Sequence, residues 1–259
     1  KVQTGYLANK PAASPDSLLD EVIDYYQKEG NAEKLADAFY YKAIGFGMRK
    51  MYQQAIQYYK KAEMKANESG NLYQQYKISE GISFVNRRNG KYDLQLKYAK
   101  KAYSLARALD KKNWIAYSCY AIEFAYTNLG FEDSASFYLQ QIPLYLRYAK
   151  KSELPVLLTT LGYYLKFNHP EEAKRYLHES LSYKELTATY EHLADISYHQ
   201  GNQDEYHDNL MKALMVKDAT PKDNIIRNLI EYDLERGKTD SISDMVTQIF
   251  EIRDSIEAK

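Results

Sequence analysis

The chain has 259 residues with a formal net charge of zero, and 45% of its residues are hydrophobic. With only 6 Pro and 11 Gly, it has too few turn-forming residues for a β-sandwich with many turns, so a mostly helical protein is predicted. The charge is uneven, because residues 1–151 hold 23 Lys and Arg against 15 Asp and Glu. Since the net charge is zero, the rest of the chain has a matching excess of Asp and Glu. A nucleic-acid-binding protein would present a continuous basic surface, so direct nucleic-acid binding by this region is not expected.

The first helix is predicted near residue 14, where Ser14 and Pro15 have the pattern of an N-cap followed by a first helical turn. We expect residues 1–13 to be a flexible N-terminal segment and residues 14–30 a leading helix. Further helices are predicted near residues 33–48, 52–68, 72–88, 92–109, 112–129, 132–149, 153–167, 170–182, 186–200, 203–217, 221–236 and 240–257. Pro143 lies inside one of them, and because proline removes a backbone donor, a kink or break is expected near Gln141.

The predicted helices form pairs that repeat along the chain. Residues 50–62 read KMYQQAIQYYKKA and residues 90–102 read GKYDLQLKYAKKA, so apolar and charged positions recur in the same phase. The two helices of a pair are joined by a short turn that often contains a glycine suited to a left-handed conformation, namely Gly90, Gly130 and Gly201. The sequence therefore predicts five helix pairs over residues 33–217 and a final pair or C-terminal cap over residues 221–259.

These pairs resemble the tetratricopeptide repeat (TPR), whose pattern has Leu followed by Gly on the first helix and a small residue, Ala, on the second. The Gly position holds, in chain order, Ala43, Ser83, Glu123, Gly162 and Ala194, and the Ala position holds Ala55, Gln95, Ala135, Ala173 and Tyr206. Because Glu123 and Tyr206 are large, the third and fifth pairs are expected to cross at wider angles. The resemblance implies one domain over residues 1–259, an all-α, right-handed TPR-like α-solenoid of about 12 to 13 antiparallel helices.

A narrower resemblance comes from the 27 tyrosines, the long repeat units and the ending FEIRDSIEAK. These features are similar to the TPR regions of Bacteroidetes membrane-associated transcriptional regulators and of related TPR lipoproteins. In such regulators the TPR region precedes a membrane span, a coiled coil and a helix-turn-helix domain. The resemblance implies the sensory or scaffolding region of a longer transcriptional or signalling regulator, which would be periplasmic or membrane-tethered. Lys1 in place of a starting Met agrees with a processed chain or a piece of a longer one. A free-standing TPR adaptor or lipoprotein without signalling output is the alternative.

The first helices of the pairs line the concave face of a TPR-like solenoid, and a protein or peptide partner is expected to bind there. Aromatic and Arg side chains dominate interface hot spots, and they gather on the first helices of the first three pairs. The candidate ligand-binding residues are Tyr40, Phe84, Arg87, Tyr117, Tyr120 and Asn128. For each ring, packing between neighbouring first helices is the alternative. Ile44, Phe84 and Phe124 stand where a clamp for a C-terminal carboxylate would have Asn, which disfavours an adaptor for chaperone tails.

Signatures of enzymes are missing from the sequence. It has no GxGxxG, no phosphate-binding loop, no HExxH and no GxSxG, so a non-enzymatic protein without a cofactor is predicted. His192, Asp195 and His199 share one helix face, and such ligands can hold zinc, which leaves a metal-binding or small-molecule-binding protein as the least favoured function. The single cysteine, Cys119, lies in an apolar stretch and is expected to be a buried hydrophobic residue.

Two expectations concern membranes and self-association. No uninterrupted run of about 18 apolar residues occurs, so no membrane span is predicted within this chain. The last predicted helix, residues 240–257, has more apolar residues than a terminal cap needs. We therefore expect it to continue into a further helix or to provide a self-association surface.

Overall fold

The computed structural model describes residues 15–218, 220 and 222–237, and in this part of the chain all regular structure is helical. The prediction of an all-α protein is confirmed. The chain divides into two compact units, Lys1–Tyr148 (unit 1) and Ala149–Lys259 (unit 2), each described here by itself. The single domain over residues 1–259 stays a prediction, and the N-terminal segment 1–13 and the helix 240–257 with its self-association surface lie outside the described residues.

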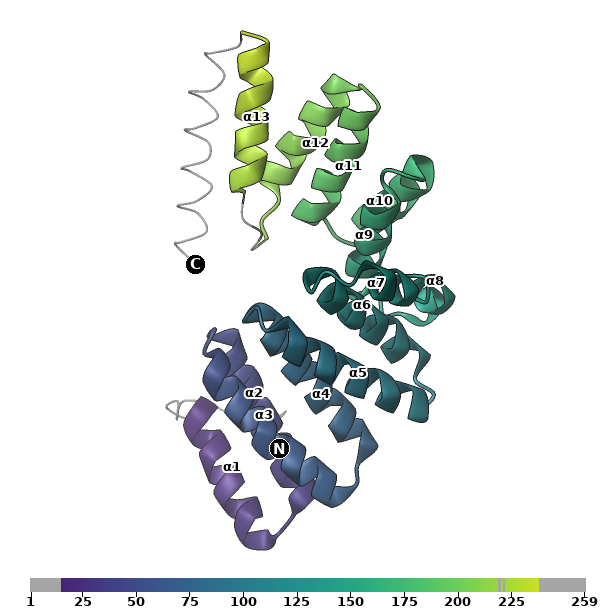
Figure 1. The fold of residues 1–259 in the computed structure, drawn as a ribbon. Helices are drawn as coiled ribbons and strands as arrows, with labels where there is room; N and C mark the ends of the chain where they lie inside the picture. Colours follow the sequence, from purple (N-terminus) through teal and green to yellow (C-terminus); the bar gives the residue numbers. More distant parts are fainter. Residues whose placement is uncertain (1–14, 219, 221, 238–259) are drawn as a thin grey trace. The chain divides into compact units, whose positions relative to one another are not determined.

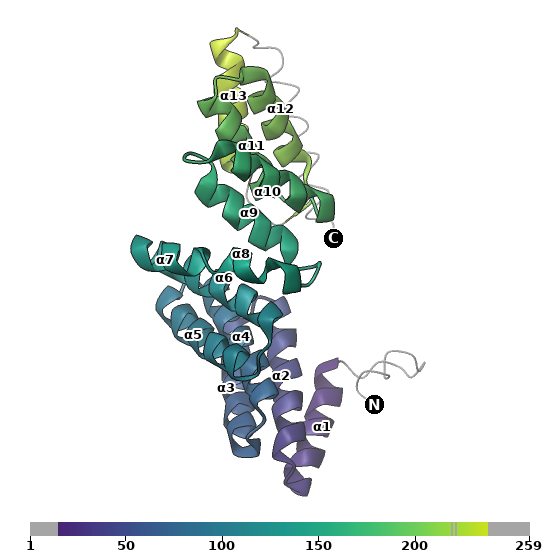
Figure 2. The ribbon, with the colours of Figure 1, turned by 90° about the vertical axis from the view of Figure 1, so that its right-hand side faces the viewer.

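Unit 1 consists of antiparallel helix pairs in which each helix packs against its neighbours in the chain (Figure 1). Its helices are α1 Pro15–Glu29, α2 Ala32–Met48, α3 Tyr52–Ser69, α4 Leu72–Arg88, α5 Tyr92–Ala108, α6 Lys112–Asn128, α7 Glu132–Leu139 and α8 Ile142–Tyr145. Besides the pairs α2 with α3, α4 with α5 and α6 with α7, helix α4 contacts both α2 and α6. Helices α2, α4 and α6 thus form one layer and α3, α5 and α7 the other (Figure 2). We call the side formed by α2, α4 and α6 the first-helix face.

The turns of unit 1 place a residue with positive φ at every twentieth position of the chain. These residues and their φ values are Gly30 at 67°, Lys50 at 60°, Gly70 at 70°, Gly90 at 67°, Asp110 at 47° and Gly130 at 79°. Glycine adopts this left-handed conformation without a steric penalty, so the expected roles of Gly90 and Gly130 as helix stops are confirmed. At Lys50 and Asp110 a side chain is held in a conformation that costs free energy.

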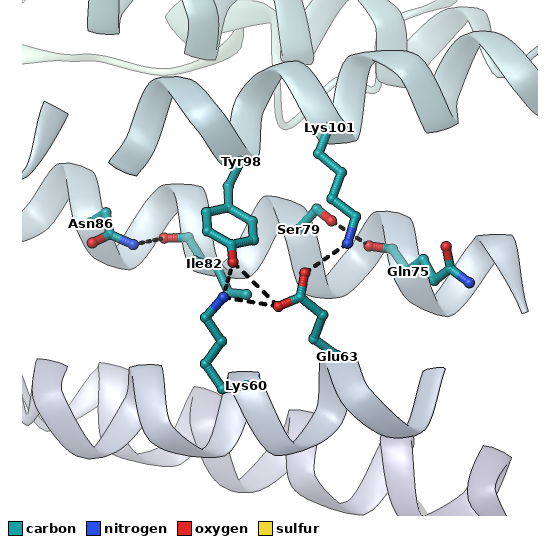
Figure 3. A network of polar contacts seen from close by, with 8 residues as sticks. All are labelled: Lys60, Glu63, Gln75, Ser79, Ile82, Asn86, Tyr98 and Lys101. Carbon is teal, nitrogen blue, oxygen red and sulfur yellow. Dashed lines mark hydrogen bonds and ion pairs between the residues drawn. The ribbon is translucent and has the colours of Figure 1, made fainter. Parts of the chain in front are cut away.

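The repeated segments 50–62 and 90–102 are confirmed as second helices, α3 and α5. Their small residues Ala62 and Ala102 are buried, which lets neighbouring helices approach closely. Polar side chains also link α3 to α5 (Figure 3): Lys60 donates to Tyr98, and the Glu63 carboxylate lies 3.0 Å from Lys60 Nζ and 2.7 Å from Lys101 Nζ. Burial alone would raise the pKa of Glu63, but the hydrogen bonds from Lys101 and Lys60 outweigh it and lower that pKa.

Pro143 breaks the helix predicted over residues 132–149, as expected. Helix α7 ends at Leu139, a short helix α8 spans Ile142–Tyr145, and a 3₁₀ turn follows over Leu146–Tyr148. The break near Gln141 is confirmed, and it lies within unit 1, which ends at Tyr148.

Unit 2 repeats the same pairing. Its described helices are α9 Leu154–Leu165, α10 Pro170–Tyr183, α11 Thr187–His199, α12 Gln203–Met215 and α13 Asp223–Glu235. A Cβ on Gly162 would lie 2.5 Å from Cγ and Cδ2 of Leu177, so α9 and α10 touch where only glycine fits. The Gly position of the TPR pattern predicts this close contact between the two helices of a pair. The described helices of both units include none that is long and apolar enough to cross a membrane.

Asp218 holds the start of α11 in unit 2. Its carboxylate accepts hydrogen bonds from the backbone N–H of Thr187 at 3.0 Å and from the Thr187 hydroxyl at 2.8 Å. Burial acts to raise the pKa of Asp218, but these bonds and those from Thr220 lower it to about 2. The loop between α12 and α13 thereby caps a helix of the preceding pair.

Candidate functional site

Arg87 of α4 lies at the centre of a cluster of aromatic rings on the first-helix face of unit 1. Its Nη1 donates a hydrogen bond to the Tyr120 hydroxyl of α6 at 2.6 Å. Its guanidinium carbon lies 5.1 Å from the ring centroid of Phe124, 5.4 Å from Phe84 and 5.5 Å from Tyr120. Contact with aromatic rings contributes about 0.5–1 kcal/mol for a cation at an exposed site. The guanidinium is thereby held in a defined direction.

The rings of this cluster differ in exposure. Tyr120 is buried, with 7% of its surface exposed, and its ring contacts Tyr117 and Phe124 at centroid distances of 5.7 and 6.2 Å. Tyr120 therefore packs between neighbouring first helices and positions Arg87. Phe84 is 43% exposed, and Tyr117 is half-buried. Of the candidate residues in this cluster, Phe84, Arg87 and Tyr117 can be reached by a partner, and the Phe124 ring beside them is also partly exposed.

The structure brings four of the six candidate residues together: Phe84, Arg87, Tyr117 and Tyr120. Tyr40 of α2 packs elsewhere, against Tyr59 at 5.9 Å and beneath Lys77 at 4.9 Å. Burial, followed by the nearby Glu80 carboxylate, raises the pKa of Tyr40, so its hydroxyl stays protonated. Asn128 is exposed at the end of α6, and its side-chain N–H₂ donates to the Phe124 carbonyl at 2.8 Å.

A small pocket of about 20 Å³ lies beside this cluster, between α4, α5 and α6. Phe84, Arg87 and Tyr117 line it, and so do the buried Gln95 of α5 and Ser118 of α6. Gln95 was not among the predicted binding residues, because it lies on a second helix and all of those were on first helices. A signal for it was present, because Gln95 occupies the Ala position of its repeat, where a small residue is expected.

The histidines of unit 2 do not form the metal site that their spacing allowed. His192 Nδ1 lies 3.8 Å from Asp195 Oδ2, but the same carboxylate oxygen accepts a hydrogen bond from Lys166 Nζ at 2.6 Å. The His199 ring packs edge-on against the Phe167 ring. Among the residues that the structure describes, no three His, Cys, Asp or Glu side chains are grouped as a metal ion requires. The residues His192, Asp195 and His199 therefore do not fit a zinc ion.

Cys119 is fully buried in α6, as expected for a small hydrophobic residue. Burial raises the pKa of its thiol to about 12. A thiol with so high a pKa carries almost no thiolate near neutral pH, so it is inert as a nucleophile.

Comparison with known proteins gives matches among solved structures. No protein-family model matches the chain, and no curated protein does. The Cut9–Hcn1 hetero-tetramer of the APC/C matches with a TM-score of 0.66 at 16% identity, over 93% of this chain and 45% of that one. The apo form of the quorum sensor NprR from B. thuringiensis matches with a TM-score of 0.60 at 15% identity, over 92% of this chain and 82% of that one.

Two further solved structures match the chain. NprR in complex with its cognate peptide NprX has a TM-score of 0.57 at 17% identity, over 90% of this chain and 70% of that one. Aspartyl phosphate phosphatase F from Bacillus subtilis has a TM-score of 0.62 at 13% identity, over 92% of this chain and 65% of that one. At such identities the likeness concerns the fold. The all-α fold of antiparallel helix pairs matches TPR solenoid structures, and the origin in Bacteroidetes stays a prediction.

Proposed function

We propose that the chain is a non-enzymatic TPR-like module that binds a peptide or protein segment on the first-helix face of unit 1. The observation that carries this proposal is the cluster of Phe84, Arg87 and Tyr117. It combines a large apolar ring that is 43% exposed with an Arg whose guanidinium is held by rings and by the Tyr120 hydroxyl. Residues of these types provide most of the binding energy at interfaces, and pre-orientation lowers the entropy lost on binding.

The chemistry of the cluster indicates what a partner segment carries. An aromatic or aliphatic side chain packed on Phe84 would remove its exposed surface from water, at about 25 cal/mol for each Å². A carboxylate is the group that the guanidinium of Arg87 binds best, because the planar N–H donors match its two oxygens. We therefore expect a segment with an apolar side chain close to an acidic one.

The known structures support two versions of this role. NprR is a quorum sensor that has been seen with its cognate peptide NprX, which favours a sensory region of a longer regulator that responds to a peptide. Cut9 is part of an assembly with Hcn1, which favours the alternative of an adaptor that holds proteins together. The gene downstream of Lys259 discriminates between them. A membrane span and a helix-turn-helix domain there would support the regulator, and an early stop codon would support the adaptor.

Catalysis is tested separately, because one similar structure is an aspartyl phosphate phosphatase. The reactive group of that substrate class is an acyl phosphate, and acetyl phosphate provides the simplest example. We expect hydrolysis of acetyl phosphate in the presence of the chain to be no faster than with an equal mass of serum albumin. A rate that increases in proportion to the chain's concentration would overturn the non-enzymatic assignment.

Binding is tested by selection of displayed random peptides on the immobilised chain. Wild type and the variants Arg87→Gln and Arg227→Gln are used in parallel; Arg227 is an exposed arginine on α13 of unit 2 and serves as the matched control. We expect wild type and Arg227→Gln to enrich the same peptides, with an acidic residue near an apolar one, and Arg87→Gln to lose them. Equal enrichment on all three proteins would contradict a site at Arg87.

A further inference from the structure

The pocket between α4, α5 and α6 has an exposed side and a buried end. Phe84, Arg87 and Tyr117 are only partly covered, whereas Gln95 and Ser118 are 0% and 2% exposed. The walls at the buried end are small side chains, Ala99 and Ala102 of α5. The pocket therefore leads from the proposed binding surface to two polar groups in the interior of unit 1.

These two polar groups lack hydrogen-bond partners. Gln95 Nε2 donates to the Ala121 carbonyl at 2.9 Å, which orients the amide, and Gln95 Oε1 is left as an acceptor without a donor. Ser118 Oγ likewise has no partner. By contrast, the buried Ser79 of α4 donates to the Gln75 carbonyl at 2.7 Å (Figure 3). A buried polar group without a partner costs free energy. A bound group that forms hydrogen bonds with both Gln95 Oε1 and Ser118 Oγ would remove that cost.

The volume of the pocket limits what can enter it. One water needs roughly 10–15 Å³ of space for its probe centre, so about 20 Å³ admits a water or a small hydroxyl-bearing group. An aromatic ring or a carboxylate with its hydration does not fit. A hydroxyl can donate to Gln95 Oε1 and accept from Ser118 Oγ at the same time.

We propose that this pocket is a subsite for a threonine or serine side chain of the bound peptide, whose hydroxyl bridges Gln95 Oε1 and Ser118 Oγ. The inference deepens the proposed function and rests on it for the peptide that carries the side chain. A water competes for the same position, and a hydroxyl that reproduces its hydrogen bonds can displace it at little cost. Valine has the shape of threonine without the hydroxyl, and in the pocket it would leave both polar groups unpaired.

The subsite is tested without knowledge of the peptide, by use of N-acetyl-threonine N-methylamide and its valine analogue as probes. Alanine methyl groups labelled with ¹³C in the full chain report binding by NMR, because Ala99 and Ala102 line the pocket. We expect the threonine probe to shift these two signals with half-saturation at about 1–100 mM, the range for a ligand of this size. The valine probe should need at least a tenfold higher concentration.

Two variants complete the test. Ser118→Ala removes one bridging group and should abolish the preference for threonine, whereas Ser79→Ala removes a buried serine of α4 that is already satisfied and should leave the preference unchanged. Circular dichroism verifies that both variants are folded. Ser118→Ala is expected to fold at least as stably as wild type, because it removes a buried hydroxyl that has no partner.

Equal binding of the two probes, or no shift of the alanine signals by either, would overturn the subsite. A threonine preference that survives in folded Ser118→Ala would overturn it as well. These outcomes are distinct from failure of the proposed function. If no displayed peptide depends on Arg87 while the threonine probe still binds with the expected preference, the proposed function is lost and the pocket remains a hydroxyl-binding site.

Discussion

Arg87 in unit 1 and Lys166 in unit 2 occupy the same repeat position, four residues after Ser83 and Gly162 in the Gly position of their pairs. Each cation reaches the next first helix, but the two meet different partners. Both cations lie over aromatic rings, Lys166 over those of Tyr163 and Phe167. On the next first helix, however, Arg87 meets the Tyr120 hydroxyl, whereas Lys166 Nζ lies 2.6 Å from the carboxylate oxygen Oδ2 of Asp195. The repeat thus determines where a cation is placed, and the neighbouring helix determines its role.

The same contrast applies one turn earlier in each helix. Phe84 and Tyr163 occupy equivalent positions, and they are 43% and 41% exposed. Tyr163 lies beside Lys166, which is buried and paired with a carboxylate, while Phe84 lies beside Arg87, whose hydrogen-bond partner is the uncharged Tyr120 hydroxyl. We therefore assign a structural role to the cluster in unit 2 and a binding role to the cluster in unit 1.

The largest effect on stability is expected from Asp195→Ala in unit 2. This change leaves the buried Lys166 ammonium without its carboxylate, and because Asp195 itself is 43% exposed, the cost should be about 2 kcal/mol, below that of a fully buried pair. Hydrogen exchange of α9 and α11 measures it. The control is Asp208→Ala, which removes an equally short pair on an exposed surface and should cost about 0.5 kcal/mol or less. Equal losses would refute the structural role of Lys166.

A smaller effect with a pH signature is expected from Asp218→Asn. The asparagine keeps an acceptor for the Thr187 N–H but loses the charge, so unit 2 should lose about 1 kcal/mol at pH 7. Because the folded-state pKa of Asp218 is lowered to about 2, its contribution is present above pH about 4 and disappears as the pH falls toward 2. Urea denaturation at pH 7 and at pH 2.5 measures it. A stability difference that stays constant over this range would contradict the charged cap.

Arg87→Gln should change the stability of unit 1 by about 1 kcal/mol or less, since it removes exposed cation–π contacts and one hydrogen bond. Fluorescence of Trp114, the only tryptophan, follows unfolding of unit 1. If the same variant loses peptide binding while unit 1 stays stable, Arg87 has a binding role that distinguishes it from the structural Lys166. A loss of several kcal/mol would instead identify Arg87 as a structural residue like Lys166.

The smallest effect concerns the regular turns of unit 1. Lys50→Gly relieves the positive φ of 60° and should stabilise the chain by about 0.5 kcal/mol, the net of relieved strain and the added entropy of unfolded glycine. Lys91→Gly, at a φ of −94°, is the control and should not stabilise. Thermal unfolding distinguishes them, and a lower midpoint for Lys50→Gly than for wild type would oppose this account of the turns.

The helices were largely predictable because each carries a local signal. The pattern of apolar residues, the glycines at 90, 130 and 201 and the break at Pro143 all act over a few residues, and the described helices follow them. The close contact at Gly162 was also predictable, since the repeat pattern places a glycine where two helices touch.

The site was less predictable because it depends on contacts between helices. The sequence placed Phe84, Arg87, Tyr117 and Tyr120 on first helices, but it did not reveal that Tyr120 is buried while Phe84 is exposed. The partner of Lys166 and the unpaired groups of the pocket also arise from neighbouring helices. Such pairings depend on side-chain directions across a helix interface, which spacing along one helix does not determine.

The central claim, that unit 1 binds a peptide on its first-helix face, is tested most directly by one titration. A peptide obtained from the display selection is titrated into wild type and into the variants Phe84→Ala and Tyr163→Ala. Each variant removes one aromatic ring, and the two rings occupy equivalent repeat positions with similar exposure. The account predicts that Phe84→Ala raises the Kd at least about tenfold and that Tyr163→Ala changes it by less than about twofold. An unchanged Kd for Phe84→Ala, or an equal loss for Tyr163→Ala, would contradict it.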